Sequence, residues 1–322
     1  MHTSRAHLCY DGDLSVLRLY AIALNTYREA VRDRVLAGVL GFACLFLLFT
    51  LAVAELSLHE QARVVSDVGL AAVSLFSVLM AVFLGSSLLY KEIERKTLYV
   101  ILPKPLSRTE FLLGKFAGIV LTVGIFLALM GGVELLTLGL EATLSARVAL
   151  LVVGGSGLLF GVLSYRLKDI ASALLPVSPL FLGACAWVGA SEATPASVVL
   201  AELLLFFGEV TVITAVALLF SSFSTPFLTG LFTLGVWILG RSADDMGTMK
   251  SRVLSEGLCR LLHGLSEVVP NFQLFVPARA LLYGEGPMPL WHYVGNTMAY
   301  GLLYAALMLA GAIFLFKRRD FL

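Results

Sequence analysis

Charged side chains are scarce in this sequence. Only 14% of its 322 residues are Asp, Glu, Lys or Arg, whereas 59% are hydrophobic. Soluble domains carry about a quarter charged residues, so this chain could not cover a water-exposed surface. Basic residues are also not in excess, because the formal net charge is only +1. A nucleic-acid-binding domain would show a basic patch or a high pI. The scarcity of charge therefore excludes both a soluble domain and a nucleic-acid partner.

Cysteine is rare as well. The four cysteines, Cys9, Cys44, Cys185 and Cys259, show neither CxxC nor metal-ligand spacing. Two of them lie inside apolar runs, where a thiol usually fills space in a core. The phosphate-binding pattern G-x-x-x-x-G-K-[ST] is absent too. We therefore expect no disulfide framework, no metal site and no catalytic site, and no cofactor bound by this chain.

A serine-protease motif lacks its base. The run Gly154–Gly157 reads Gly-Gly-Ser-Gly, like the motif of intramembrane serine proteases, whose serine a histidine activates. The histidines lie outside the apolar runs or at the edge of the last one: His2, His7, His59, His263 and His292. Close packing between helices explains these small residues better.

Long apolar runs are abundant. A membrane-spanning helix needs about 20 mostly apolar residues. Eight runs approach this length: Val35–Ala54, Val68–Tyr90, Phe111–Leu138, Ala146–Tyr165, Ala171–Ala190, Val198–Phe220, Phe227–Gly240 and Trp291–Phe316. We predict an all-α transmembrane bundle forming one domain over residues 1–322. It has eight spans, or six if residues 146–190 form a hairpin that only dips into the membrane. The run Phe227–Gly240 is short enough to re-enter rather than cross.

The positions of Lys and Arg predict an orientation. These residues concentrate near span ends on the cytoplasmic side. They gather in four segments that the predicted spans place on one side: 28–34, 91–108, 166–168 and 317–319. We expect both termini in the cytoplasm, with residues 241–290 as an extracytoplasmic loop. Within that loop, Met249–Val269 has the spacing of an amphipathic helix, which Pro270 ends.

The N-terminal segment, residues 1–34, alternates apolar and charged residues. From Leu14 on, the apolar positions Leu17, Ala21, Leu24 and Ala30 oppose the charged positions Arg18, Arg28, Glu29 and Arg32, and Arg34 follows. This pattern is typical of an amphipathic helix in the membrane interface, contacting lipid headgroups through its basic residues. The alternative is a plain basic N-terminus that only orients the first span.

Residues 91–110 combine more features than a simple connection between two spans needs. Glu92, Glu94, Arg95 and Lys96 form a charged, helix-compatible run, and Thr97, Leu98 and the residues to Leu102 are largely apolar. Pro103 and Pro105 then break the helix. Ser107 and Glu110 have capping-box spacing before the next span, and Arg108 lies between them. We expect this segment to dock a cytoplasmic partner; the alternative is an ordinary basic loop.

These motifs resemble a known family. The sequence KEIERKTLYVILPKPLSRTEFLLGK is similar to the cytoplasmic signature of type-2 ABC transporter permeases, matching at Glu92, Glu94, Arg95, Thr97, Leu98, Pro105, Leu106, Ser107, Arg108, Gly114 and Lys115. Lys96 stands where many members have Gly. The segment Asn25–Arg34 resembles the N-terminal helix of the multicopper-enzyme-maturation branch. Leu218–Ser224 and Phe316–Phe321 resemble a cytoplasmic turn and the usual family ending. Members usually have six spans, so residues 146–190 would be an added hairpin.

The resemblance implies a transport subunit. Such a permease, typically an exporter of the bacterial inner membrane, pairs with a separate ATPase subunit that holds ATP and Mg²⁺. The chain would form a homodimer or pair with a second permease, and lipid would surround it. Residues 92–108 would be the coupling helix and residues 14–34 the interfacial helix. The substrate cannot be read from the sequence.

Two carboxylates within one apolar run are candidates for the substrate pathway. Glu209 falls near the middle of the run Val198–Phe220, and Glu202 lies closer to its outer end. Intramembrane carboxylates are costly and often functional. The alternatives are a hydrogen bond from a neighbouring span to Glu209 and a simple interfacial position for Glu202. Glu134 and Glu141 are expected to be solvated. An ion-coupled secondary transporter and a non-transporting scaffold for an ATPase remain as competing functions.

Overall fold

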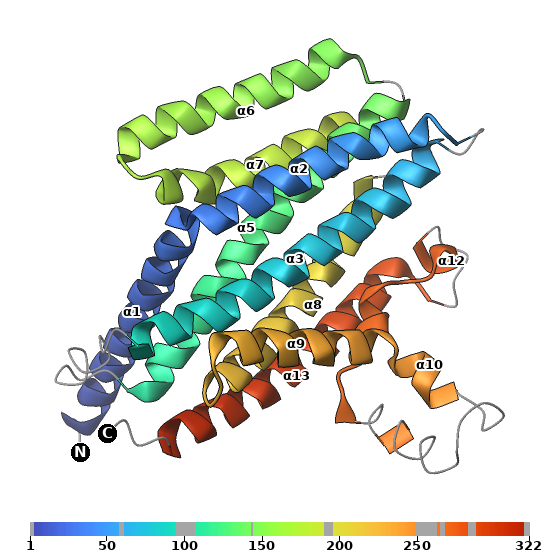
Figure 1. The fold of residues 1–322 in the computed structure, drawn as a ribbon. Coiled ribbons are helices and arrows are strands. Elements are labelled where there is room, and N and C mark those ends of the chain that lie inside the picture. The colour runs from blue at the N-terminus through green and yellow to red at the C-terminus, as the bar shows by residue number, and fades with distance from the viewer. Residues whose placement is uncertain are drawn as a thin grey trace.

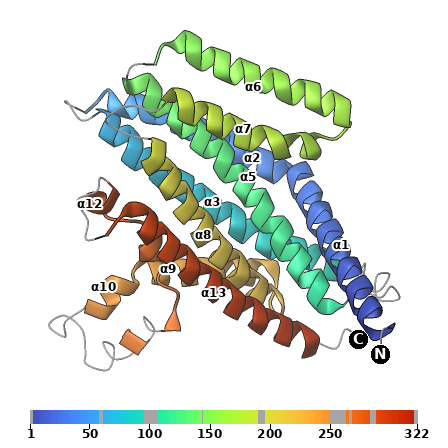
Figure 2. The same ribbon diagram turned by 180° about the vertical axis from the view of Figure 1, so that it is seen from behind.

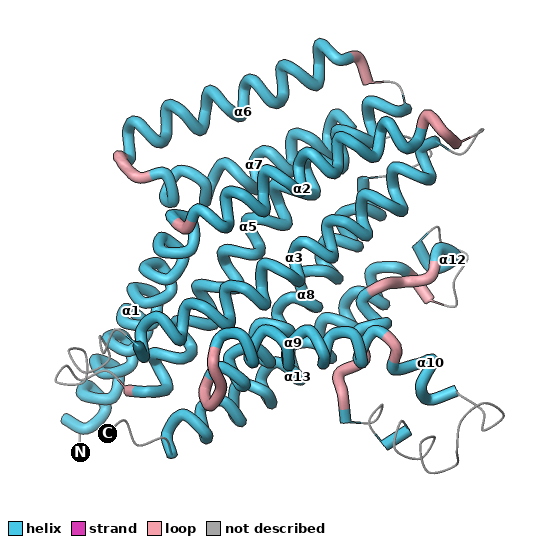
Figure 3. Tube along the Cα trace, in the orientation of Figure 1, coloured by secondary structure: helices cyan, strands magenta, loops and turns pink. Residues whose placement is uncertain are grey.

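The computed structural model describes residues 3–57, 61–94, 107–142, 144–189, 196–248, 263–264, 268–282 and 288–318. This part of the chain contains no strand, and seven of its helices are long and apolar enough to cross a membrane. Figure 3 shows that most of the described residues are helical. The predicted all-α polytopic bundle is confirmed. By the length and composition of its helices, the chain is an integral membrane protein.

Long helices run side by side in the bundle (Figure 1). The seven candidate spans lie in α2 (Arg34–Ala54), α3 (Gln61–Glu94), α5 (Arg108–Ala142), α6 (Ala146–Leu167), α7 (Ile170–Gly189), α8 (Ala196–Ser221) and α13 (Leu290–Arg318). A further apolar helix, α9 (Pro226–Arg241), has only 16 residues. The run Phe227–Gly240, the seventh of the eight predicted, thus forms a helix shorter than the seven candidate spans.

Helix α8 forms the centre of the bundle. Its candidate span is 78% buried inside the chain, the largest share of any span in the described residues. It packs against α3, α5, α9 and α13. Because α8 is apolar on all faces, this burial is what its sequence predicts.

Helices α6 and α7 form the predicted additional hairpin. Each has at least 20 residues, so each is long enough to span rather than to dip into the membrane. Lys168, with a left-handed φ of 52°, ends α6 at the turn between them. Helix α7 packs against α5, whereas α6 lies at the edge of the bundle (Figures 1 and 2), and only 6% of its span is buried. Ser156 in α6 donates its hydroxyl to the Val153 carbonyl of its own helix. The expected close packing of Gly154–Gly157 is not found in the described residues, because no neighbouring helix lies within 4 Å of the Cβ positions of these glycines.

The predicted N-terminal helix is present and longer than expected. Helix α1 (Thr3–Arg32) packs its second half on α5 and α7. Ala23, Thr26, Tyr27 and Ala30 are buried there. The predicted apolar face is only partly the buried one, because Leu17 and Ala21 are exposed. Mostly small residues, with Tyr27, lie at the contact instead, because α1 crosses α5 closely at Gly114 and Gly118.

Part of the predicted outer loop packs into the bundle. Phe272 and Phe275, in the 3₁₀ helix η1 (Phe272–Phe275), are completely buried. A Cβ atom at Gly208 of α8 would lie 2.8 Å from the Phe275 ring, so this glycine makes the space for it. The short helices α10 (Ala243–Thr248) and α12 (Arg279–Leu282) flank this region. The predicted amphipathic helix Met249–Val269 lies largely outside the described residues.

Two ends of the bundle can be distinguished. The start of α1, the end of α3, the start of α5 and the end of α13 lie together at one end (Figures 1 and 2), which we call the α1 end. The starts of α3 and α8 lie at the opposite end.

Candidate functional site

Glu209 is the centre of a buried polar cluster. Its side chain is 0% exposed near the middle of α8. Arg241 donates two hydrogen bonds to its carboxylate, from Nε to Oε1 and from Nη2 to Oε2, each 3.1 Å long. Trp237 Nε1 also donates to Oε1, at 2.8 Å, and Ser74 Oγ donates to Oε2 at 3.3 Å. Four hydrogen bonds therefore connect α8 with α3 and α9.

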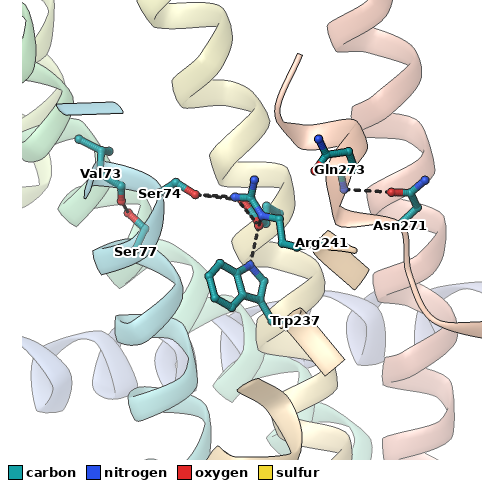
Figure 4. A network of polar contacts seen from close by, with 8 residues as sticks. Val73, Ser74, Ser77, Trp237, Arg241, Asn271 and Gln273 are labelled. Carbon is teal, nitrogen blue, oxygen red and sulfur yellow. Dashed lines mark hydrogen bonds and ion pairs between the residues drawn. The ribbon is translucent and has the colours of Figure 1, made fainter. Parts of the chain in front are cut away.

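Helix α9 positions both donors from its last turn. Arg241 ends α9, where a cation suits the helix dipole, and Trp237 lies four residues earlier on the same face. The guanidinium carbon of Arg241 also lies 5.6 Å from the centre of the Trp237 ring. Its Nη2 donates to Ser74 at 2.8 Å, as Figure 4 shows. The guanidinium binds both oxygens of Glu209, donates to Ser74 and stacks on Trp237, and these contacts together fix its position.

A cavity opens beside this cluster towards the end opposite the α1 end. It has a volume of about 440 Å³ and lies between α3, α8, α9 and residues 276–282. Polar and aromatic side chains line part of it: Ser66, Asp67, Ser74, Glu202, Phe206, Trp237 and Arg241. Arg241 is neutralised by Glu209, and Asp67 pairs with the exposed Arg63 at 3.9 Å. The mixed lining suits a ligand with both apolar and polar parts.

The two predicted pathway residues are thus brought to one place. Glu202 lines the cavity, and Glu209 lies behind its wall, bonded to Arg241. The alternative reading of Glu209, a hydrogen bond from a neighbouring span, holds through Ser74. Its main partner, however, is Arg241, which the sequence assigned to the outer loop. Whether either carboxylate contacts a substrate stays a prediction.

Glu134 contradicts the expectation that it is solvated. The side chain is 0% exposed in α5. Its carboxylate faces Gly69 of α3, where any Cβ atom would overlap it. Helices α3 and α8 both pack against α5. They enclose Glu134, so its side chain does not reach solvent. Sequence reasoning missed it because a carboxylate near a predicted span end looks solvated.

At the α1 end, the predicted capping box is confirmed. The Ser107 hydroxyl accepts the Glu110 N–H at 3.1 Å, and the Glu110 carboxylate accepts the Ser107 N–H at 3.0 Å. Arg108 donates to the carbonyls of Phe316 and Lys317, at 3.3 and 3.0 Å. These carbonyls end α13, so Arg108 joins the start of α5 to the end of α13.

Most of the predicted coupling segment lies outside the described residues. Glu92 and Glu94 belong to the last turn of α3, but their side chains lie outside the described part of the chain. The remaining predicted positions also lie outside the described residues: Arg95, Lys96, Thr97, Leu98, Pro103 and Pro105. Among the coupling residues, only Arg108 has a described side chain.

The charged residues of α1 bind the turn between α6 and α7. Arg28 Nε lies 3.1 Å from Oδ2 of Asp169, and Arg32 Nη2 lies 3.4 Å from Oδ1. The hydroxyl of Ser172 donates to Asp169 at 2.8 Å, and this bond, with the two arginines, lowers the pKa of Asp169. The arginines predicted to contact lipid headgroups thus also contact protein.

Two further residues of α1, Tyr27 and Glu29, hold this helix in place. The Tyr27 hydroxyl donates to the Ala171 carbonyl at 2.6 Å, and burial raises the pKa of Tyr27. Glu29 lies 3.7 Å from the ammonium of Lys115, which is 1% exposed in α5. Arg34 begins α2, and Asp33 caps that helix by accepting the Val35 N–H.

The fold and these sites together define a polytopic α-helical membrane protein with a partly polar cavity at one end. In the described residues, no group of three or more His, Cys, Asp or Glu side chains is arranged to hold a metal ion. Comparison of the sequence with protein-family models and with curated proteins found no match.

Proposed function

We propose that this chain is the membrane-spanning permease subunit of an ABC-2-type transporter, an exporter driven by a separate ATPase subunit. The observation that carries the proposal is the arrangement of the α1 end. There the end of α3 and the start of α5, which flank the family-like sequence, lie together with the start of α1 and the end of α13 (Figures 1 and 2). A partner that binds this sequence would act at the end of the bundle where α1, α3, α5 and α13 lie together.

The contacts at the α1 end support a mechanical role. Arg108 fixes the start of α5 to the end of α13, and the Phe111 and Phe316 rings stack with centres 6.3 Å apart. Helix α1 packs on the next two turns of α5, at Gly114 and Gly118. A displacement of the start of α5 would therefore move α1 and α13 with it.

The cavity at the other end would release or receive substrate. Helices α3 and α8 run from the α1 end to the cavity, and α5 packs against both. Closure of an ATPase dimer at the α1 end would tilt these helices and change the cavity. In this mechanism ATP and Mg²⁺ remain in the partner, and the present chain supplies the pathway.

The test is recovery of the ATPase from native membranes. The solubilised chain is purified by affinity and its partners are identified by mass spectrometry. A variant with Glu92→Ala, Arg95→Ala and Leu98→Ala should lose an ATPase subunit that the wild-type chain retains. The matched control carries Glu141→Ala, Arg147→Ala and Leu150→Ala, the same residue types at the opposite end, and should retain it. Recovery of no ATPase by the wild-type chain would refute the proposal.

One observation favours the ion-coupled alternative. Besides Glu209, a second carboxylate, Glu134, is buried within the spans. Such groups often mark ion pathways. Glu209 itself weakens this reading, because three residues donate hydrogen bonds to its carboxylate and one of them, Arg241, is a cation. Flux in reconstituted vesicles separates the functions: an ABC permease needs ATP and its partner, whereas a secondary transporter needs only an ion gradient.

A further inference from the structure

The surroundings of Glu134 are unlike those of Glu209. Thr137 is its one hydrogen-bond donor in the described part of the chain, at a long 3.5 Å, and that hydroxyl makes a shorter bond of 2.8 Å to the Glu134 carbonyl. The Oε1 atom is buried without any hydrogen-bond partner there. Glu209, in contrast, accepts four hydrogen bonds. Two carboxylates in one bundle therefore have opposite environments.

No cation compensates Glu134 in the described residues. Helix α3 presents Gly69 to it, and α7 meets α5 on either side through Phe181 and Gly189. The ionisable group that acts on it from α8 is another acid, Glu202. Helix α2 carries only Arg34 and Cys44 as ionisable residues, and Arg34 lies at the α1 end. On α3, Arg63 and Asp67 pair with each other and are more than half exposed.

An ionised carboxylate is not stable in such a place. Moving one into an apolar interior without a partner costs many kcal/mol, so the group takes up a proton instead. A second acid nearby adds repulsion, so two neighbouring carboxyl groups release their protons as a coupled pair. Glu134 is enclosed, but Glu202 lines the cavity. The pair thus connects a buried position with a space open to water.

We propose that Glu134 and Glu202 form a proton-binding site between α3, α5 and α8. Glu134 holds the proton at neutral pH, and Glu202 exchanges it with water in the cavity. The proton moves from water to a Glu202 oxygen and from there to Glu134, leaving Glu202 ionised again. The space left by the missing side chain of Gly69 holds the Glu134 carboxyl group, and it suits a neutral group because no counter-ion lies there in the described residues. The ligand of this site is the proton alone, whatever drives transport.

Infrared spectroscopy of the purified full-length chain in detergent tests the proposal directly. A protonated carboxyl group has its own carbonyl stretching band, which a carboxylate lacks. The wild-type chain should show this band at neutral pH, and Glu134→Gln should remove it. Glu141→Gln, a matched change in the last turn of α5, should leave it. Absence of the band in the wild-type chain, or its persistence in Glu134→Gln, would overturn the proposal.

The role of Glu202 needs a separate measurement. On transfer to heavy water, the band shifts as the carboxyl proton exchanges. Glu202→Gln should keep the band but slow this shift several-fold, because the exchanging group is lost. An unchanged exchange rate would contradict the proposed path. Glutamine has the shape of the protonated acid, so Glu134→Gln should melt at the wild-type temperature. A large fall in melting temperature would show that an ionised Glu134 is needed and would also overturn the proposal.

This outcome is independent of the ATPase test. A missing carbonyl band would leave the ABC-2 proposal intact, and a missing ATPase would leave the proton site intact.

Discussion

At the scale of single residues, the ion pair between Glu209 and Arg241 carries the largest expected energetic effect. Arg241→Ala leaves the Glu209 charge buried without a counter-ion. We expect the free energy of unfolding to fall by about 3–5 kcal/mol, as for other broken buried pairs. Denaturant unfolding of the purified chain in detergent measures this change.

The control for this prediction is Arg63→Ala, which breaks an exposed pair with Asp67. Exposed pairs contribute about 0–1 kcal/mol, so this variant should unfold almost like the wild type. Combining Glu209→Gln with Arg241→Gln leaves no unmatched charge and should recover part of the lost stability. Equal effects for Arg241→Ala and Arg63→Ala would contradict the structural role of the pair.

Asp169 should make the attachment of α1 depend on pH. Its pKa is lowered by the Ser172 hydrogen bond and by Arg28 and Arg32. A carboxyl group with a lowered folded-state pKa contributes its full stabilisation above the unfolded pKa of about 3.9. That contribution is lost as the pH falls through the folded-state value. Asp169→Asn removes the dependence.

The attachment can be followed by limited proteolysis near the junction of α1 and α2. Wild-type cleavage should accelerate as the pH falls below about 4 and through the lowered pKa of Asp169, where this group takes up its proton. The Asp169→Asn variant should be cleaved faster than wild type at neutral pH and should show less acceleration in acid. Identical pH profiles for the two proteins would exclude Asp169 as the responsible group.

The carboxylates show what sequence reasoning reaches at this scale. Glu209 and Glu202 could be singled out because a charge inside an apolar run is visible in the sequence. Arg241 and Ser74 could not be matched to Glu209, because depth along a helix does not reveal which neighbour faces it. For the same reason Glu134 looked solvated. The pairing of residues far apart in sequence is decided by packing.

At the scale of elements, the crossing of α1 and α5 depends on two glycines. A Cβ atom at Gly118 would lie 2.6 Å from the backbone oxygen of Ala23, and one at Gly114 would lie 2.7 Å from the Ile22 side chain. Gly118→Leu should therefore push α1 away and cost about 1–3 kcal/mol, as overpacking usually does. Hydrogen exchange of the α1 amides should increase.

Gly154 in α6 provides the matched control, because no atom lies within 4 Å of its Cβ position. Gly154→Leu introduces the same side chain into a helix of similar composition and should leave exchange in α1 unchanged. Unaltered protection of α1 in Gly118→Leu would mean that the two helices are not in close contact in the membrane.

Most helices could be predicted because apolar length is a strong signal. Seven runs became helices of spanning length, and the weakest, Phe227–Gly240, became the short α9. The capping box also fixed the start of α5, since its two hydrogen bonds are local. The buried face of α1 was predicted less well. Its periodicity marks an apolar stripe, whereas the contact depends on small residues that match the glycines of another helix.

At the scale of the whole molecule, the orientation in the membrane can be tested by labelling. In a background without the four native cysteines, single cysteines replace Ser145, before α6, and Lys168, after it. If α6 crosses the membrane, a membrane-impermeant maleimide added outside intact cells should label Ser145→Cys only. Lys168→Cys should react after the cells are opened. Labelling of both from outside would mean that α6 does not cross.

The attachment of α1 to the turn after α6 has a consequence for biosynthesis. Arg28 and Tyr27 leave the ribosome long before Asp169 and Ala171, their partners across 141 and 144 residues of chain. During that interval α2, α3, α5 and α6 are synthesised while the turn that anchors α1 does not yet exist. The first helix made thus receives part of its attachment last: a chain stopped before α7 can pack α1 on α5 but lacks the contacts of Tyr27 and Arg28 with Ala171 and Asp169.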